Sequence, residues 1–235
     1  NETPHLLKDP QWLKENIEFS SELFLGHLRY NTCEKSDITS VHPFIINSTW
    51  ISRSIVVAGN FHLTNSDELF ADLVSLGQHP IESGDTITLL ETIANHVNKA
   101  NDDLYKIYKS QGIPKYDISK KIQEDIDIQK VLQGASRNWD GGYIFCGMLG
   151  HGDAFVLRDP AGIRPAFYFQ NDEVIVAASE RPAIQTAFNI SSKDIHEIPR
   201  GNALIIKRNG SVTIKECNSP TEAKQCSFER IYFSR

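Results

Sequence analysis

The sequence predicts an α+β fold in which helices are combined with mostly antiparallel sheets. Helical periodicity dominates the middle of the chain and gives way to short strand-like runs from Tyr143 onward. Turns of a few residues join these strands, which indicates antiparallel pairing, because parallel strands need long crossover connections. No glycine-rich loop follows a strand and opens a helix, which argues against a dinucleotide-binding fold.

Helical patterns account for most of the first half of the chain. A short helix is expected over residues 9–19, with Pro10 at its first position. An apolar run predicts a buried strand over residues 54–58. Three further helical segments are expected: one after the cap residues 64–66 and ending at Gly77, one opening at 84–86, and one around 122–132, after a break near Gly112 and Pro114.

Strand patterns account for the second half. The strands expected are residues 143–149, 154–158, 166–169, 173–177, 202–207 and 212–215, with a further strand at the FERIYF segment, 228–233. Asn209-Gly210 predicts a hairpin turn between two of them, because these residues readily adopt the positive φ angles of such turns.

Composition bounds the function classes. The 235 residues are 40% hydrophobic and 23% charged, with a net charge of -6, as in ordinary globular proteins. The mild acidity argues against a nucleic-acid or membrane-surface partner. No apolar run approaches the roughly 20 residues of a membrane-spanning helix, and no signal peptide is visible. The four cysteines form no C-x-x-C pair, which favours free thiols in a reducing cytoplasm: Cys33, Cys146, Cys217 and Cys226.

Two polar clusters are candidates for substrate contact. Arg29 lies in Gly-His-Leu-Arg-Tyr, where an arginine can grip a carboxylate through two hydrogen bonds or form a structural ion pair. Asn60 and Phe61 follow the apolar strand, where a side-chain amide and a backbone N–H can form an oxyanion hole. A turn that uses Gly-Asn is the alternative interpretation.

Two more clusters carry charge at constrained positions. Asp85 opens a predicted helix and is either an N-cap or a carboxylate that binds a substrate ammonium. Arg158, Asp159 and Arg164 lie in Arg-Asp-Pro-Ala-Gly-Ile-Arg-Pro, between two expected strands. That turn either binds an anion or is locked by its own arginine and aspartate, with the prolines fixing the backbone.

In this order, the segments resemble one family. GHLRY, GNFHLTN, GD at a helix start, RDPAGIRP, ASE and the terminal CSFERIYFSR together resemble the class II glutamine amidotransferases of the N-terminal-nucleophile hydrolase superfamily. The stretch from Gly150 to Phe188 and the terminal segment look most similar to the amidophosphoribosyltransferases. The resemblance implies a four-layer α-β-β-α sandwich and covers most of the chain from Leu25 onward, with less signal over residues 100–138.

The resemblance assigns roles to the candidate residues. Arg29 looks like the arginine that holds the α-carboxylate of glutamine, and Asp85 like the aspartate that holds its α-ammonium. Asn60 looks like the oxyanion-hole side chain, with the N–H of Phe61 as the second donor. Many relatives have glycine at the Phe61 position, so the larger side chain is a departure. By the same resemblance, three further residues are expected to brace the floor of the site: Arg158, Asp159 and Arg164.

The main departure from the family lies at the start of the chain. The family's nucleophile is a cysteine at the mature N-terminus, whose own α-amine is the general base. Residue 1 here is Asn1, and no cysteine is near it. We therefore expect residues 1–235 to be one glutamine amidotransferase domain, incomplete at its N-terminus and followed by a phosphoribosyltransferase domain in the parent protein. This chain alone is expected not to hydrolyse glutamine.

The resemblance implies an activity for the parent. It would hydrolyse glutamine and pass ammonia to phosphoribosyl pyrophosphate, forming phosphoribosylamine for purine biosynthesis, as a cytoplasmic homo-oligomer. No cofactor is expected in this chain; Mg²⁺ is expected in the phosphoribosyltransferase domain. Cys226 is a possible iron–sulfur ligand of the parent, although a plain cysteine is the simpler interpretation. The alternatives are the glutaminase domain of another class II enzyme, such as an asparagine synthetase or a hexosamine-forming synthase, and a non-catalytic protein that binds glutamine or regulates a partner.

Overall fold

The computed structural model describes residues 8–28, 41–78 and 85–232. Two sheets lie against each other, one of six strands in the order β1-β2-β3-β4-β8-β9 and one of three in the order β6-β5-β7. Every strand pairing in these sheets is antiparallel. The strands are β1 (Phe44–Ile46), β2 (Ile55–Leu63), β3 (Gly141–Leu149), β4 (Ala154–Arg158), β5 (Phe167–Gln170), β6 (Ile175–Ala178), β7 (His196–Glu197), β8 (Asn202–Ile206) and β9 (Val212–Glu216).

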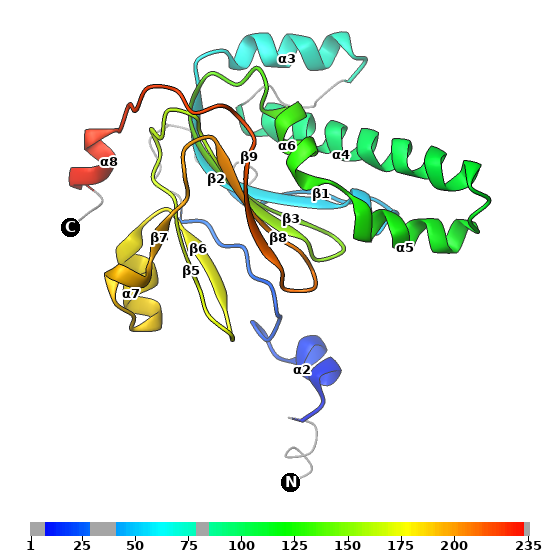
Figure 1. The fold of residues 1–235 in the computed structure, drawn as a ribbon, viewed down its shortest axis with the longest axis horizontal. Helices are drawn as coiled ribbons and strands as arrows, with labels where there is room; N and C mark the ends of the chain where they lie inside the picture. Colours follow the sequence, from blue (N-terminus) through cyan, green and yellow to red (C-terminus); the bar gives the residue numbers. More distant parts are fainter. Residues whose placement is uncertain (1–7, 29–40, 79–84, 233–235) are drawn as a thin grey trace.

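Helices cover the outer faces of both sheets (Figure 1). Helices α4 and α6 pack on the larger sheet, α3 and α5 pack against α4, and α7 packs on the smaller sheet. The expected α-β-β-α sandwich is therefore confirmed. The helices are α2 (Pro10–Asn16), α3 (Ser66–Ser75), α4 (Asp85–Ser110), α5 (Lys115–Asp125), α6 (Ile128–Ala135), α7 (Arg181–Phe188) and α8 (Ser227–Tyr232). No helix among the described residues is long and apolar enough to span a bilayer.

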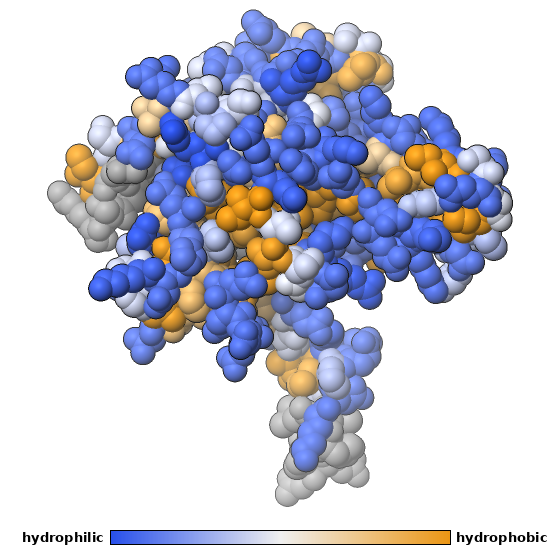
Figure 2. All heavy atoms as spheres, viewed as in Figure 1, coloured by the Kyte–Doolittle hydropathy of each residue, from blue (hydrophilic) through white to orange (hydrophobic). Residues whose placement is uncertain are grey.

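Alternation along β3 divides its buried side chains between two cores. Val57 and Phe145 belong to the larger core, between the six-stranded sheet and the helices. Ile144 belongs to the smaller core, between the two sheets, with Val156 and Leu204. Since successive side chains of a strand point to opposite faces, β3 contributes to both cores, whereas the β2 side chains assigned to a core belong to the larger one. The surface in Figure 2 is mostly hydrophilic, with hydrophobic side chains grouped near its centre.

The helical elements follow local signals. Asp9 caps α2 by accepting from the N–H of Gln11, 2.9 Å away, and Pro10 occupies the first turn, as expected. Gly77 and Gly112 adopt positive φ angles where α3 and α4 end, a conformation that glycine adopts without steric cost.

The structure corrects three predicted elements. Strand β2 does not stop at residue 58 but continues to Leu63, because β3 pairs with it along its whole length. The helix expected around residues 122–132 is two helices, separated where Asp127 caps α6. The FERIYF segment begins in helix α8 and is not a strand within the described residues. Strand β1, helix α7 and strand β7 were not predicted from the sequence.

A buried charge cluster joins the β3–β4 hairpin to the β8–β9 hairpin. Asp153 is 1% exposed and accepts from the N–H of Arg208 at 2.7 Å and from the ammonium of Lys207. His151 Nε2 lies 3.1 Å from Asp153 Oδ2, without good hydrogen-bond geometry. Burial raises the pKa of Asp153, but its contacts with His151, Lys207 and the Arg208 N–H lower that pKa by more, so the net shift is downward. The cluster therefore favours the carboxylate form.

We predict that Asp153→Asn lowers the free energy of unfolding by about 1–3 kcal/mol at neutral pH, because it leaves buried donors without an ionised acceptor. A lowered pKa in the folded state contributes stability above the ordinary carboxyl pKa of about 4, and that contribution is lost as the pH falls through the folded value. Urea unfolding of the wild type and the variant should therefore converge in acid. The matched control is Asp172→Asn, at an exposed turn. A difference that stays constant with pH would contradict the assignment.

Candidate active site

The structure brings two of the predicted site residues into one row of the larger sheet. Asn60 of β2 lies opposite Ile144 of β3, and Ile144 lies opposite Arg158 of β4. Residues that face each other across neighbouring strands project to the same side, so Asn60 and Arg158 flank Ile144 on the face toward the smaller sheet. Two strand spacings separate their backbones by about 10 Å. Asn60 therefore projects from the same face of the sheet as the buried Arg158 side chain.

Phe61 directs its ring to the opposite face. The ring stacks on Phe145 with a centroid distance of 4.6 Å and packs against the core under the helices. The ring therefore takes no space on the side of the sheet to which Asn60 projects. A phenylalanine at this position changes the helix-side core and leaves the inter-sheet face open.

The backbone N–H of Phe61 points along the sheet toward the β1 edge. In an antiparallel strand, neighbouring residues direct their N–H groups to opposite sides. The Thr64 N–H reaches Asp140 next to β3, so the even-numbered residues of β2 point that way, and Gly59 and Phe61 point toward β1. Strand β1 pairs only with residues 55–57, so Phe61 lies beyond its last paired residue. An amide side chain and a neighbouring backbone N–H thus come together at one sheet edge.

Polar side chains hold the far end of β2. Thr64 Oγ1 donates to Asp140 Oδ2 at 2.5 Å. Asn65 Nδ2 donates to the carbonyl of Asn138 at 2.8 Å, and Asn65 Oδ1 accepts from the N–H of Asp140 at 3.2 Å. Asn65 was expected only as a helix cap, yet its side chain makes no cap hydrogen bond to α3. It ties the end of β2 to the start of β3 instead, which fixes the strand that carries Asn60.

Gly59 permits a close backbone approach beside Asn60. A Cβ at this position would collide with the carbonyl oxygen of Ile144 and lie 3.2 Å from the Phe145 ring. Only glycine therefore fits between β3 and the ring that packs on Phe61.

Arg158 and Asp159 make the hydrogen bonds of a locked turn. Arg158 donates to the carbonyl of Arg164 at 2.8 Å and to that of Ile198 at 2.6 Å, and it pairs with Glu197 at 2.7 Å. Asp159 accepts from the N–H groups of Ile163 and Arg164, at 2.9 and 3.0 Å. The guanidinium of Arg158 and the carboxylate of Asp159 are thus engaged within the fold. Their place at the floor of a substrate site stays a prediction.

The same turn anchors the C-terminal segment. The N–H groups of Thr221 and Lys224 donate to the carbonyls of Pro160 and Ala161, at 2.9 and 3.0 Å. Arg200 adds a hydrogen bond to the carbonyl of Thr221 at 2.7 Å. This run leads to Cys226 and helix α8, so the turn also positions the point from which the chain leaves the sandwich (Figure 1).

Two predicted site residues are not placed. Arg29 lies outside the described residues. Asp85 begins α4, as expected, but its side chain also lies outside the description. The proposed clamp on the α-carboxylate and α-ammonium of glutamine therefore stays a prediction.

Two of the described cysteines are poor nucleophiles. Burial raises the pKa of the Cys146 thiol to about 12, and burial likewise raises that of Cys217 to about 12. Both thiols therefore stay protonated at neutral pH. Since the thiolate is the reactive form, neither is a good nucleophile. Cys226 is half-buried and Cys33 lies outside the described residues. Among the residues that the structure describes, no group of three His, Cys, Asp or Glu could hold a metal ion.

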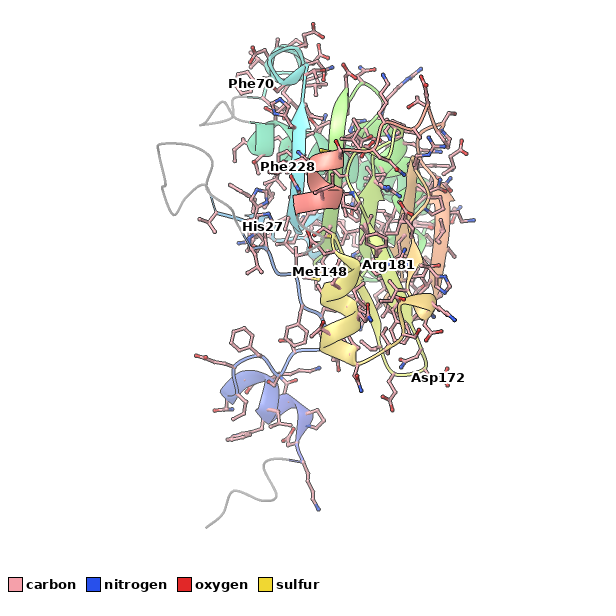
Figure 3. The ribbon with its side chains drawn as sticks, turned by 90° about the vertical axis from the view of Figure 1, so that its left-hand side faces the viewer. His27, Phe70, Met148, Asp172, Arg181 and Phe228 are labelled. Carbon is pink, nitrogen blue, oxygen red and sulfur yellow. The ribbon has the colours of Figure 1, made fainter. Side chains whose placement is uncertain are left out.

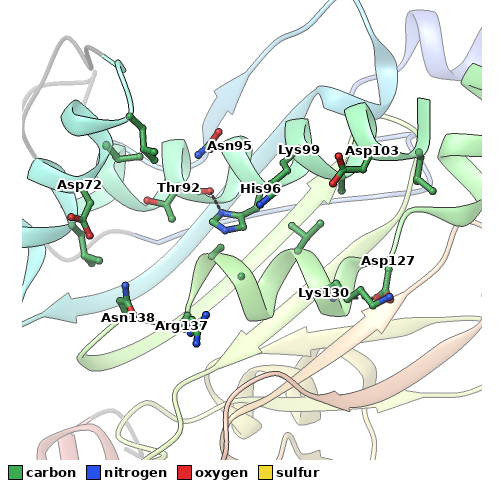
Figure 4. Close-up of a pocket in the computed structure, with 18 of the residues that line it drawn as sticks. Asp72, Thr92, Asn95, His96, Lys99, Asp103, Asp127, Lys130, Arg137 and Asn138 are labelled. Atoms are coloured by element: carbon green, nitrogen blue, oxygen red, sulfur yellow. Dashed lines mark hydrogen bonds and ion pairs between the residues drawn. The ribbon is translucent and has the colours of Figure 1, made fainter. Parts of the chain in front are cut away.

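A pocket of about 830 Å³ opens on the other side of the larger sheet, between α3, α4 and α6 (Figure 4). His96 fills its middle and packs over Gly134, and its Nδ1 donates to the carbonyl of Thr92 at 3.0 Å. Lysine, arginine and aspartate side chains all line the pocket, and Lys130 pairs with Asp127 at 3.6 Å. The mixed charges favour no ligand class, and neither Asn60 nor Arg158 lines this pocket.

Comparisons with known proteins agree with this arrangement. Over 217 residues the chain is 27% identical to amidophosphoribosyltransferase of Pasteurella multocida, covering 90% of this chain and 38% of the relative. The Escherichia coli K12 amidophosphoribosyltransferase is 27% identical over 220 residues, with the same two shares. The chain therefore spans about two fifths of the length of the relatives it matches. No protein-family model matches it.

Solved structures show the same fold. Glutamine phosphoribosylpyrophosphate amidotransferase from B. subtilis, complexed with ADP and GMP, matches with a TM-score of 0.63 and 25% identity, covering 89% of this chain and 38% of that chain. A structure described as the allosteric regulatory enzyme of purine biosynthesis matches with a TM-score of 0.65 and 24% identity, with the same coverage. The resemblance to the amidophosphoribosyltransferases and the N-terminal-nucleophile hydrolase fold are thereby confirmed.

The buried thiols yield a direct prediction. At about pH 8, iodoacetamide should modify Cys226 well before Cys146 and Cys217, because the pKa values of these two thiols are raised, Cys217 is buried and Cys146 packs against the core between the sheets. Peptide mass spectrometry of the folded protein measures the order, and the same reaction in denaturant is the control in which the difference should vanish. Rapid modification of Cys146 in the folded protein would contradict its burial between the sheets.

Proposed function

We propose that this chain is the glutamine-hydrolysing domain of a glutamine-dependent amidophosphoribosyltransferase. The geometry at Asn60 and Phe61 carries the proposal, because a side-chain amide and a backbone N–H share the edge of β2. The similarity to amidophosphoribosyltransferases over nine tenths of the chain supports the substrate class. Glutamine binds on the inter-sheet face, and its side-chain carbonyl lies at the β2 edge.

The chemistry at this edge is acyl transfer. Attack on the glutamine side-chain carbonyl places negative charge on its oxygen. Donors aimed at that oxygen stabilise the transition state more than the ground state. Asn60 Nδ2 and the Phe61 N–H supply these donors, and the hydrogen bonds of Thr64 and Asn65 keep their strand from shifting. The attacking thiolate is not supplied by Cys146 or Cys217, which stay protonated. In class II amidotransferases it belongs to a mature N-terminal cysteine.

The released ammonia reacts elsewhere in the longer protein. It displaces pyrophosphate from phosphoribosyl pyrophosphate and forms phosphoribosylamine, with Mg²⁺ at that second site. We further propose that the protein works in the cytoplasm as a homo-oligomer. The sparse cysteines support a reducing compartment.

The proposal can be tested by measuring two rates of phosphoribosylamine synthesis with the full-length protein, one with glutamine and one with ammonia. Synthesis of phosphoribosylamine should proceed with glutamine or with ammonia as the nitrogen source. Failure with both sources would contradict the proposed parent enzyme. Activity with ammonia alone would favour a domain that does not hydrolyse glutamine.

We predict that Asn60→Ala lowers the glutaminase kcat by about 10²–10³-fold with a modest change in KM, the usual loss for one oxyanion donor. Ammonia-dependent synthesis should stay near the wild-type rate. His62→Ala is the matched control, because His62 projects from the same face of β2 and is exposed. A change confined to KM would mean that Asn60 binds glutamine in its ground state.

We predict that Arg29→Ala raises the glutamine KM about 30-fold or more, because loss of one buried charged contact costs about 2–5 kcal/mol. The ammonia-dependent rate should not change, since ammonia has no α-carboxylate. Arg137→Ala, on the helix side of the larger sheet, is the control. An unchanged glutamine KM would remove Arg29 from the site.

A further inference from the structure

His42 continues the line of β1 beside the candidate oxyanion hole. Phe44 of β1 lies opposite Val57 of β2, and His42, two residues before Phe44, lies next to Gly59. At this point the imidazole acts in place of a backbone acceptor: the Gly59 N–H donates to His42 Nδ1 at 3.3 Å. A nitrogen that accepts carries no proton, so the proton of the neutral ring is on Nε2.

Three aromatic contacts fix the His42 ring. It stacks on His27 with centroids 4.4 Å apart, meets Phe44 edge-on at 4.9 Å, and lies 5.6 Å from the Phe61 ring. His27 lies at the edge of the larger sheet beside β2 (Figure 3). Packing against these three rings thus holds the imidazole in place independently of its hydrogen bond. A single side chain contacts the residues on both sides of Asn60.

This contact bears on the donors because the strand needs support on both edges. Strand β3 holds one edge of β2 through a continuous ladder, and β1 ends its pairing at Val57. Beyond that point lie Gly59, the most flexible residue type, and the Phe61 N–H that points the same way. An acceptor at Gly59 restrains the peptide just before Asn60, and ring packing restrains Phe61 just after it.

We propose that His42 is a positioning residue for the oxyanion donors, acting through its Nδ1 acceptor on the Gly59 N–H. The inference rests on the proposed glutaminase function and adds a residue that the sequence motifs did not single out. His42 makes no contact with the reacting atoms in this role. Its contribution is to hold Asn60 Nδ2 and the Phe61 N–H in the geometry that the transition state needs, where small displacements are costly.

Two substitutions separate the acceptor from the ring. His42→Phe keeps an aromatic ring among His27, Phe44 and Phe61 and removes the acceptor. His42→Asn removes the ring and keeps an oxygen close to the position of Nδ1. In the full-length protein, His42→Phe should lower the glutaminase kcat about 10–100-fold with glutamine KM within about twofold. His42→Asn should retain most of the activity. Ammonia-dependent synthesis should be unchanged in both variants.

Hydrogen exchange supplies a readout that does not depend on catalysis. The peptide spanning residues 55–63 should exchange faster in His42→Phe than in the wild type or in His42→Asn. Full kcat in His42→Phe, or a larger loss in His42→Asn than in His42→Phe, would overturn the proposal, because packing and not the acceptor would then matter. Loss of the ammonia-dependent rate would show general misfolding and would also overturn it.

The same assays distinguish a failure of the proposed role of His42 from a failure of the proposed glutaminase function. A wild-type protein that uses ammonia but not glutamine would overturn both the glutaminase assignment and the role of His42. A wild-type protein that uses both, with equal kcat in the wild type and His42→Phe, would overturn the role of His42 alone.

Discussion

The antiparallel pairing of β2 with β3 is the constraint on which the rest of the structure depends. The ladder runs from Ile55 opposite Leu149 to Leu63 opposite Gly141, without interruption. Because the side-chain period of a strand is two residues, this register decides at once which side chains enter each core. A shift of one residue would either send Phe145 into the inter-sheet space or bring Asn60 under the helices. The same register therefore determines both the composition of the two cores and the position of the candidate site.

The register also places the helix-side pocket and the candidate site on opposite faces of the larger sheet. The pocket beside His96 lies on the helix side, where apolar side chains from α3, α4 and α6 meet around mixed charges. The candidate site lies on the other face, where Asn60 and Arg158 flank Ile144. Pocket size alone would favour the helix side. The argument for the inter-sheet face comes from chemistry, because the Asn60 amide projects there, next to the Phe61 N–H that points toward the β1 edge.

Sequence reasoning succeeded where the signal was local and failed where it depended on a distant partner. The α+β class with antiparallel sheets, the ends of α3 and α4, and the Asn209-Gly210 hairpin follow from periodicity, glycine and turn chemistry, whereas the α-β-β-α layering came from the family resemblance. The extent of β2 does not, because Gly59-Asn60 is typical of a turn until β3 pairs with it. Helix α8 was misjudged because FERIYF is rich in residues that also favour strands.

The candidate site shows the same division. Motif similarity identified Asn60 and Phe61, but nothing local marks His42, which acts across 17 residues, or the contact of Thr64 with Asp140 across 76. Such contacts exist only once strands have been brought together. Arg158 combines both kinds of contact: it bonds within its own turn, which the sequence already indicated could be locked, and also to Ile198 and Glu197, which no local signal marks.

Phe61 shows why a backbone donor tolerates a change that a side-chain donor does not. Many class II amidotransferases have glycine at this position, and a phenylalanine there suggests a blocked site when the sequence is considered alone. On a strand, however, the side chain and the N–H of one residue point in perpendicular directions. The ring packs on Phe145 under the helices, while the N–H stays directed along the sheet toward the β1 edge. Substitution at Phe61 therefore alters the helix-side core, whereas at Asn60 it removes the donor itself.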